Sequence, residues 1–110
     1  MKIRYILQPE STTFGEFAEK NDLTMQVVER EHWQIRTGRP RYYAEFVSAE
    51  VKIGNCLHGF YGEGDTAEEA IKDYYTGHIE GHNLIINATN PKTRREIRVP
   101  TGLKLEWKSE

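Results

Sequence analysis

One stretch of this 110-residue chain, residues 59–82, constrains the fold more than any other. It opens with glycines at positions 59, 62 and 64, which suit the end of a strand, a bulge and a turn. Thr66 is a good helix N-cap, and Glu69 three residues later completes a capping box, in which each side chain satisfies a free backbone N–H. We therefore expect a strand, a glycine-rich turn and a helix that ends at Gly81.

The expected helix has one apolar face. Its apolar residues recur at spacings of three and four, which places them on one stripe that a core can bury. The stripe consists of Ala67, Ala70, Ile71 and Tyr74, with His78 as a further candidate.

Length and composition bound the class of protein. A chain of 110 residues is expected to form one domain, residues 1–110, that buries roughly two-thirds of its unfolded surface. The formal net charge of −2 gives no overall attraction for nucleic acid. A single cysteine, Cys56, excludes an internal disulfide and suits a reducing compartment. No signal peptide or membrane-spanning run is recognisable, so we expect a soluble cytoplasmic protein with no membrane contact and no cofactor.

The rest of the chain alternates between strand and helix patterns. Residues 13–21 predict a short helix, with Ser11, Thr12 and Thr13 as N-cap candidates. Strands are predicted over residues 2–8, 23–33, 42–53, 56–61, 83–87, 94–99 and 103–108, with a loop at 34–41. The resulting β-α-β-β-β-α-β-β order predicts an α+β fold: a single antiparallel sheet of five to seven strands with two helices packed on one face.

Two charged clusters are candidate binding surfaces. The acidic one surrounds the start of the main helix and consists of Glu63, Asp65, Glu68, Glu69 and Asp73. The basic and aromatic one consists of Arg36, Arg39, Arg41, Tyr42, Lys92, Arg94, Arg95 and Arg98. If the loop at 34–41 and the turn after Asn90 lie at one end of the sheet, the basic residues form one anion-binding surface. The alternative for both clusters is ordinary solvated charge.

Catalytic and metal motifs are weak. No nucleophile elbow, phosphate-binding loop or dinucleotide fingerprint is present, which favours a non-enzymatic protein. The donors Cys56, His58, His78 and His82 match zinc in number, but their spacing fits no established finger, so packing or surface roles are favoured over a metal site.

The element order from residue 13 to residue 79 resembles that of double-stranded-RNA-binding domains. This resemblance implies recognition of RNA shape through basic side chains, for which Arg36, Arg39 and Arg41 lie in the matching loop. The matching helix start carries Asp65, Glu68 and Glu69 where those domains place basic residues.

Residues 62–71, Gly-Glu-Gly-Asp-Thr-Ala-Glu-Glu-Ala-Ile, resemble the turn and helix of HicB-type antitoxins. The resemblance implies a related strand-hairpin-helix layout and a partner-neutralising function. The DNA-binding segment that usually follows in HicB proteins is not recognisable after Leu84.

In size and in its lack of enzyme motifs, the chain also resembles small orphan proteins of bacteriophages and mobile elements, including anti-CRISPR proteins. This resemblance implies an inhibitor that occludes a host protein or nucleoprotein, such as a defence or CRISPR effector. Direct binding of nucleic acid by a module like a double-stranded-RNA-binding domain is the alternative. A homodimer through edge pairing of the last strand is also open.

Overall fold

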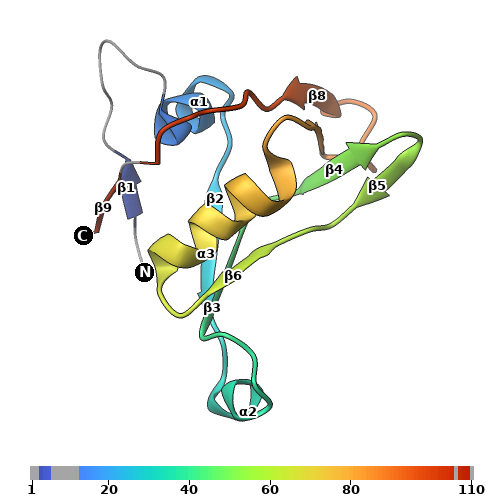
Figure 1. The fold of residues 1–110 in the computed structure, drawn as a ribbon. Helices are drawn as coiled ribbons and strands as arrows, with labels where there is room; N and C mark the ends of the chain where they lie inside the picture. Colours follow the sequence, from blue (N-terminus) through green and yellow to red (C-terminus); the bar gives the residue numbers. More distant parts are fainter. Residues whose placement is uncertain (1–2, 6–12, 106, 110) are drawn as a thin grey trace.

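The computed structural model describes residues 3–5, 13–105 and 107–109 of the chain. Helices and strands follow one another as in Figure 1. They are β1 (Ile3–Tyr5), α1 (Phe14–Lys20), β2 (Met25–Glu29), α2 (His32–Arg36), β3 (Tyr42–Phe46), β4 (Ala49–Ile53), β5 (Cys56–His58), β6 (Gly62–Gly64), α3 (Ala67–Tyr74), the π-helix η1 (Tyr75–Ile79), β7 (Asn83–Ile86), β8 (Arg95–Arg98) and β9 (Trp107–Ser109).

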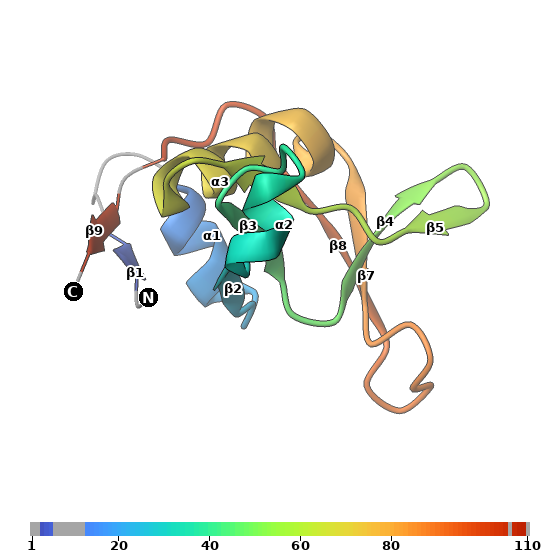
Figure 2. The same ribbon diagram turned by 90° about the horizontal axis from the view of Figure 1, so that it is seen from below.

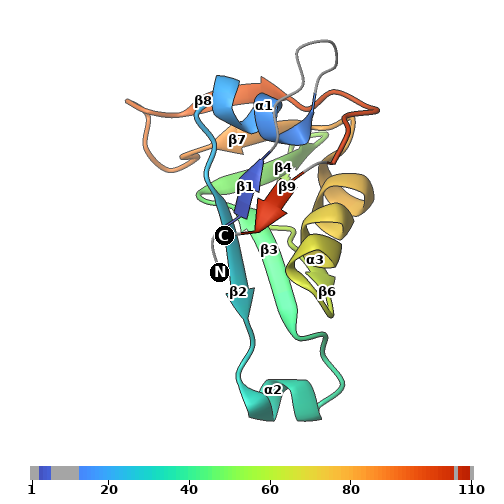
Figure 3. The same ribbon diagram turned by 90° about the vertical axis from the view of Figure 1, so that its left-hand side faces the viewer.

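The mixed α and β architecture with antiparallel pairing is confirmed, but the prediction of a single sheet is wrong. The described strands form a three-stranded sheet in the order β2-β3-β6 and a four-stranded sheet in the order β5-β4-β7-β8. A separate antiparallel pair joins β1 to β9. In Figure 3 the four-stranded sheet crosses one end of the three-stranded sheet.

The two sheets arise because the expected strand over residues 42–53 breaks at Val47 and Ser48. Ser48 has a φ of +59°, which no regular strand accommodates. The break also reverses the alternation: Ala44 and Phe46 are buried before it, and Ala49 and Val51 after it. In an unbroken strand Val47 would lie on the same face as buried Val51, but Val47 is exposed.

The main helix begins as predicted and ends differently. Thr66 accepts the backbone N–H bond of Glu69 at 3.1 Å, and the four predicted stripe residues of α3 are all buried. After Tyr74 the helix widens into the π-helix η1, and Gly81, with a φ of +77°, follows its end. His78 lies in η1 and is half-exposed, so it stands at the border of the apolar stripe.

Helix α3 lies directly on β6. A Cβ atom on Gly62 would collide with the backbone of α3 at the Ala70 carbonyl oxygen and the Tyr74 nitrogen. A Cβ on Gly64 would lie 2.6 Å from the Ala70 nitrogen. These two glycines are therefore strand residues that admit a close backbone approach, rather than the predicted bulge and turn.

Helix α1 lies where the two sheets meet. Thr13 caps it by accepting the Glu16 N–H bond at 3.0 Å. The ring of Phe14 contacts those of Phe46, at the end of β3, and Tyr75, in η1, with centroid distances of 5.3 and 4.9 Å. Helices α1 and α3 thus pack into one core between the sheets, which corrects the expected packing of two helices on one sheet face.

The ends of the chain agree only partly with the predicted strands. Ser11, Thr12 and the second half of the strand predicted over residues 2–8 lie outside the described residues. In the strand predicted over residues 103–108, Leu103 is buried and Lys104 forms a parallel bridge with Thr13 before β9 pairs with β1. Among the helices of the described residues, none has the length and apolar character needed to cross a bilayer.

Candidate functional site at the α2 end

Helix α2 forms a projection at one end of the molecule. It connects β2 to β3 and lies beyond the end of the three-stranded sheet, far from the four-stranded sheet (Figure 3). None of its residues is buried. The side chains of α2 are therefore accessible to solvent or to a binding partner.

Helix α2 replaces the predicted end of a strand and the first part of the predicted loop, while residues 37–41 form a loop as predicted. A capping box stabilises the start of α2. The Gln34 side-chain oxygen accepts the Glu31 backbone N–H bond at 2.9 Å. The Thr37 hydroxyl donates to the Gln34 carbonyl at 2.6 Å, and Gly38 continues the chain with a φ of +90°. Glutamate is an uncommon N-cap, so the residue types around Glu31 do not resemble a usual helix start. The three-residue spacing of Glu31 and Gln34 is the one sequence signal for this helix.

Arg30 anchors the base of the projection. Its side chain is only 2% exposed and forms an ion pair with Glu63 of β6 at 2.6 Å. It also donates to the Pro40 carbonyl at 2.8 Å, and its guanidinium lies 5.1 Å from the ring centroid of Tyr43. Arg30 therefore ties together the end of β2, the segment before β3 and β6. It is absent from the predicted site residues, because nothing in the sequence marks it as buried.

Exposed aromatic and basic side chains lie on α2 and on the segments near its base. Trp33 is 66% exposed, an unusual state for the largest apolar side chain. Tyr61, 37% exposed, meets Tyr43 edge to face with centroids 5.7 Å apart.

Within the described part of the chain, Arg36 and Arg39 take part in no ion pair, whereas Arg41 lies 3.8 Å from Glu29. Tyr42, another predicted member, points the other way and packs against the core.

A small cleft lies beside α2. Its volume is about 260 Å³. Its lining consists of two arginines, one glutamine and two tyrosines: Arg30, Gln34, Arg39, Tyr43 and Tyr61.

The other predicted basic residues lie elsewhere, so the condition for a single basic surface, a shared end of the sheet, is not met. Strand β8 and the turn before it are at the opposite end of the molecule from α2 (Figures 1 and 3). Arg95 donates to the carbonyls of Asn21 and Asp22 after α1, Arg94 to that of Ala88, and Arg98 to the Asn83 side chain. The backbone N–H of Lys92 closes the turn by donating to the Asn90 side chain at 3.1 Å.

Most of the predicted acidic surface serves the fold. Glu63 pairs with Arg30, and Asp73 accepts the Glu63 backbone N–H bond at 2.9 Å while lying 3.6 Å from His78. The Glu69 carboxylate accepts a hydrogen bond from the Asp65 N–H at 3.1 Å, one residue before Thr66, so only the Thr66 half of the predicted capping box has the predicted partners. Glu68 lies half-buried on the first turn of the same helix. Asp73 thus bonds α3 to β6, Glu63 bonds β6 to Arg30, and Glu69 closes the turn between β6 and α3.

The four zinc-ligand candidates do not converge. The ring of Phe60 contacts the rings of both His58 and His78, with centroid distances of 5.1 and 5.3 Å. Cys56 is exposed at the start of β5, and His82 lies beyond the end of η1. No group of three or more metal-ligand side chains occurs in the described residues.

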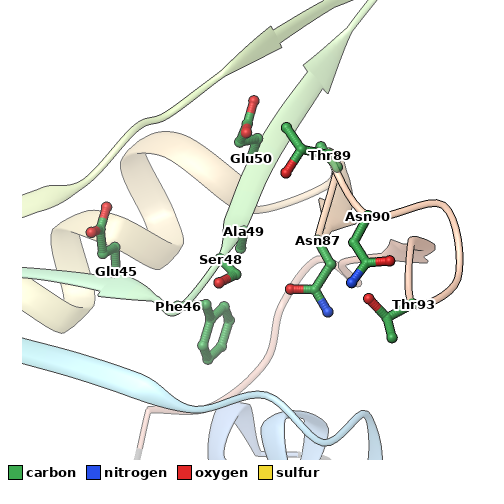
Figure 4. A pocket seen from close by; sticks show the side chains of 10 residues that line it. Glu45, Phe46, Ser48, Ala49, Glu50, Asn87, Thr89, Asn90 and Thr93 are labelled. Carbon is green, nitrogen blue, oxygen red and sulfur yellow. The ribbon is translucent and has the colours of Figure 1, made fainter.

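A larger polar cleft lies where β3 passes into β4, opposite the turn after β7. It has a volume of about 410 Å³ (Figure 4). Burial raises the pKa of Glu45 on its wall. The carboxylates of Glu45 and Glu50 point away from the amides of Asn87 and Asn90, so the polar groups do not converge on one point.

Comparisons of this chain with family models, with curated proteins and with solved structures found no match. The resemblances to HicB antitoxins, to double-stranded-RNA-binding domains and to phage orphan proteins therefore stay predictions. The function of the protein is inferred from the geometry at the α2 end.

Proposed function

We propose that the protein is a non-enzymatic binding protein that occludes a partner protein by docking through α2. The observation that carries the proposal is Trp33, exposed on a projecting helical turn that ends at Arg36 and is followed by exposed Arg39. Tryptophan, tyrosine and arginine are the residues most enriched among those that dominate binding energy in protein interfaces. The target class that we favour is a host protein or nucleoprotein, as the resemblance to phage inhibitors implies.

The anchored base of the projection supports this proposal. Arg30 holds the segments on either side of α2, so little conformational entropy is lost when the projection docks. The acidic cluster is a weaker candidate, because Glu63, Glu69 and Asp73 already accept bonds within the fold.

A capture experiment from nuclease-treated bacterial lysate tests the proposal. The tagged wild-type chain is compared with Trp33→Ala and with Ile53→Ala. Ile53 is the matched control because it is 44% exposed and belongs to β4, well away from α2 (Figure 2). We expect one protein partner to be captured by wild type and Ile53→Ala, and at least about tenfold less by Trp33→Ala.

Two results would contradict this function. Capture that does not depend on Trp33 would place the interface elsewhere. Partners that vanish with nuclease, with affinity falling steeply as salt rises, would instead favour the nucleic-acid-binding alternative.

A further inference from the structure

We propose that the cleft beside α2 receives an aspartate or glutamate side chain of the partner protein. This inference rests on the proposed function and adds the chemistry of the partner. The cleft, at about 260 Å³, is smaller than the roughly 300–1,000 Å³ of typical small-molecule pockets, and it suits a single inserted side chain.

The lining offers hydrogen-bond donors and no carboxylate in the part of the chain that the structure describes. The Gln34 side-chain oxygen accepts a backbone N–H bond, so its NH₂ group remains to donate. The hydroxyls of Tyr43 and Tyr61 add two further potential donors. Such a set favours an anionic group.

The charge balance favours one anion. Arg30, at the base, is already paired with Glu63. Arg41 does not line the cleft and is close to Glu29. Among the described residues that line the cleft, Arg39 is the cation without an ion pair. One carboxylate in the cleft would balance it.

Hydrogen bonds on both sides of Arg39 hold its backbone in position. The Gly38 N–H donates to the Ile35 carbonyl at 3.0 Å on one side. On the other side, the Pro40 carbonyl accepts from the Arg30 guanidinium at 2.8 Å. A guanidinium fork on a fixed backbone can bind a carboxylate through two parallel hydrogen bonds. A nucleic acid would bring several phosphates, and one unpaired cation in a small cleft matches a single side chain better.

The test is a nuclear magnetic resonance titration of the full ¹⁵N-labelled chain with the blocked tripeptide Ala-Glu-Ala. The isosteric Ala-Gln-Ala and inorganic phosphate serve as comparison probes. We expect millimolar Ala-Glu-Ala to shift the side-chain N–H signals of Arg39 and Gln34, while Ala-Gln-Ala leaves them unchanged. Arg39→Gln should weaken the binding at least about tenfold, because a charge-assisted fork is lost. Arg98→Gln, at the other end of the molecule, should leave it unchanged.

Three results would overturn the inference: no shift with Ala-Glu-Ala, equal shifts at arginines throughout the chain, or shifts with phosphate alone. The two proposals fail separately. Tripeptide binding at Arg39 without Trp33-dependent capture would remove the proposed function and keep the carboxylate site. Capture that depends on Trp33 but is unchanged by Arg39→Gln would keep the proposed function and remove the carboxylate site.

Discussion

Arg30 organises the candidate site although its own side chain is hidden. Its guanidinium is paired with Glu63, bonded to the Pro40 carbonyl and stacked against Tyr43. A buried arginine without its counter-charge is costly, whereas an ion pair in water contributes little to stability. The buried Arg30–Glu63 pair and the exposed Arg41–Glu29 pair should therefore contribute differently to the free energy of unfolding.

This difference predicts unequal effects of two similar substitutions. Glu63→Gln should lower the free energy of unfolding by about 1–3 kcal/mol, because the Arg30 charge stays buried and part of the Glu63 side chain faces solvent. Glu29→Gln, in an exposed pair with Arg41, should change it by about 0.5 kcal/mol or less. Urea unfolding of both variants measures this. Equal effects would contradict the anchoring role of Arg30.

Buried Tyr74 should make the free energy of unfolding depend on pH in the alkaline range. Burial raises the pKa of its hydroxyl from 10.0 to about 12. The folded state then keeps a proton that the unfolded state releases, so this contribution is full below pH 10 and is lost as pH rises through about 12. Burial raises the pKa of Tyr75 as well.

We therefore expect the free energy of unfolding to fall between pH 10 and pH 12, and to fall less steeply in Tyr74→Phe. Urea denaturation at a series of pH values measures the slope. The variant still contains Tyr75, so the slope should shrink rather than disappear. Parallel curves for the two proteins would contradict the role of Tyr74.

At the scale of elements, the contact between β6 and α3 depends on glycine. Gly62→Ala would drive a methyl group into the α3 backbone at Ala70 and Tyr74, neither of which can move as a flexible side chain would. We expect a loss of about 3 kcal/mol in the free energy of unfolding, at the upper part of the range for overpacking.

Gly59→Ala is the matched control for this prediction. Apart from Gly59 itself and its two chain neighbours, no atom lies within 4 Å of a Cβ added at Gly59. That variant should be as stable as wild type, or slightly more so, because alanine has fewer unfolded conformations than glycine. Thermal and urea unfolding compare the two. Equal stabilities would show that β6 and α3 separate readily.

At the scale of the molecule, the predicted basic residues divide into two groups at opposite ends (Figures 1 and 3). Arg36, Arg39 and Arg41 lie at the α2 end, and Lys92, Arg94, Arg95 and Arg98 lie in β8 and the turn before it. The double variants Arg36→Gln/Arg39→Gln and Arg94→Gln/Arg98→Gln lower the formal charge equally. Only the first should reduce partner capture, by roughly tenfold, because only the first alters the α2 end. If the net charge of the molecule governed binding, both variants would lose affinity together.

Much of the local structure followed from the sequence. The caps at Thr13 and Thr66 and the buried stripe of α3 all depend on residues close to one another along the chain. Short-range hydrogen bonds and side-chain periodicity determine such features, so the pattern of residue types reveals them. The capping box of α2 is also a short-range feature, but it was not predicted because glutamate is an uncommon N-cap residue.

The division of the strands between two sheets and the pairing of charged side chains depend on contacts between residues far apart in the sequence. Ser48 adopts its φ of +59° where the Asn87 N–H donates to its carbonyl at 3.0 Å, and this break assigns β3 and β4 to different sheets. Glu63 became a structural partner of Arg30 rather than part of a docking surface. The start of α1, the start of α3 and the apolar face of α3 could be predicted from the sequence, because those features depend on neighbours along the chain. Which charges are free to bind depended on residues that only the fold brings together.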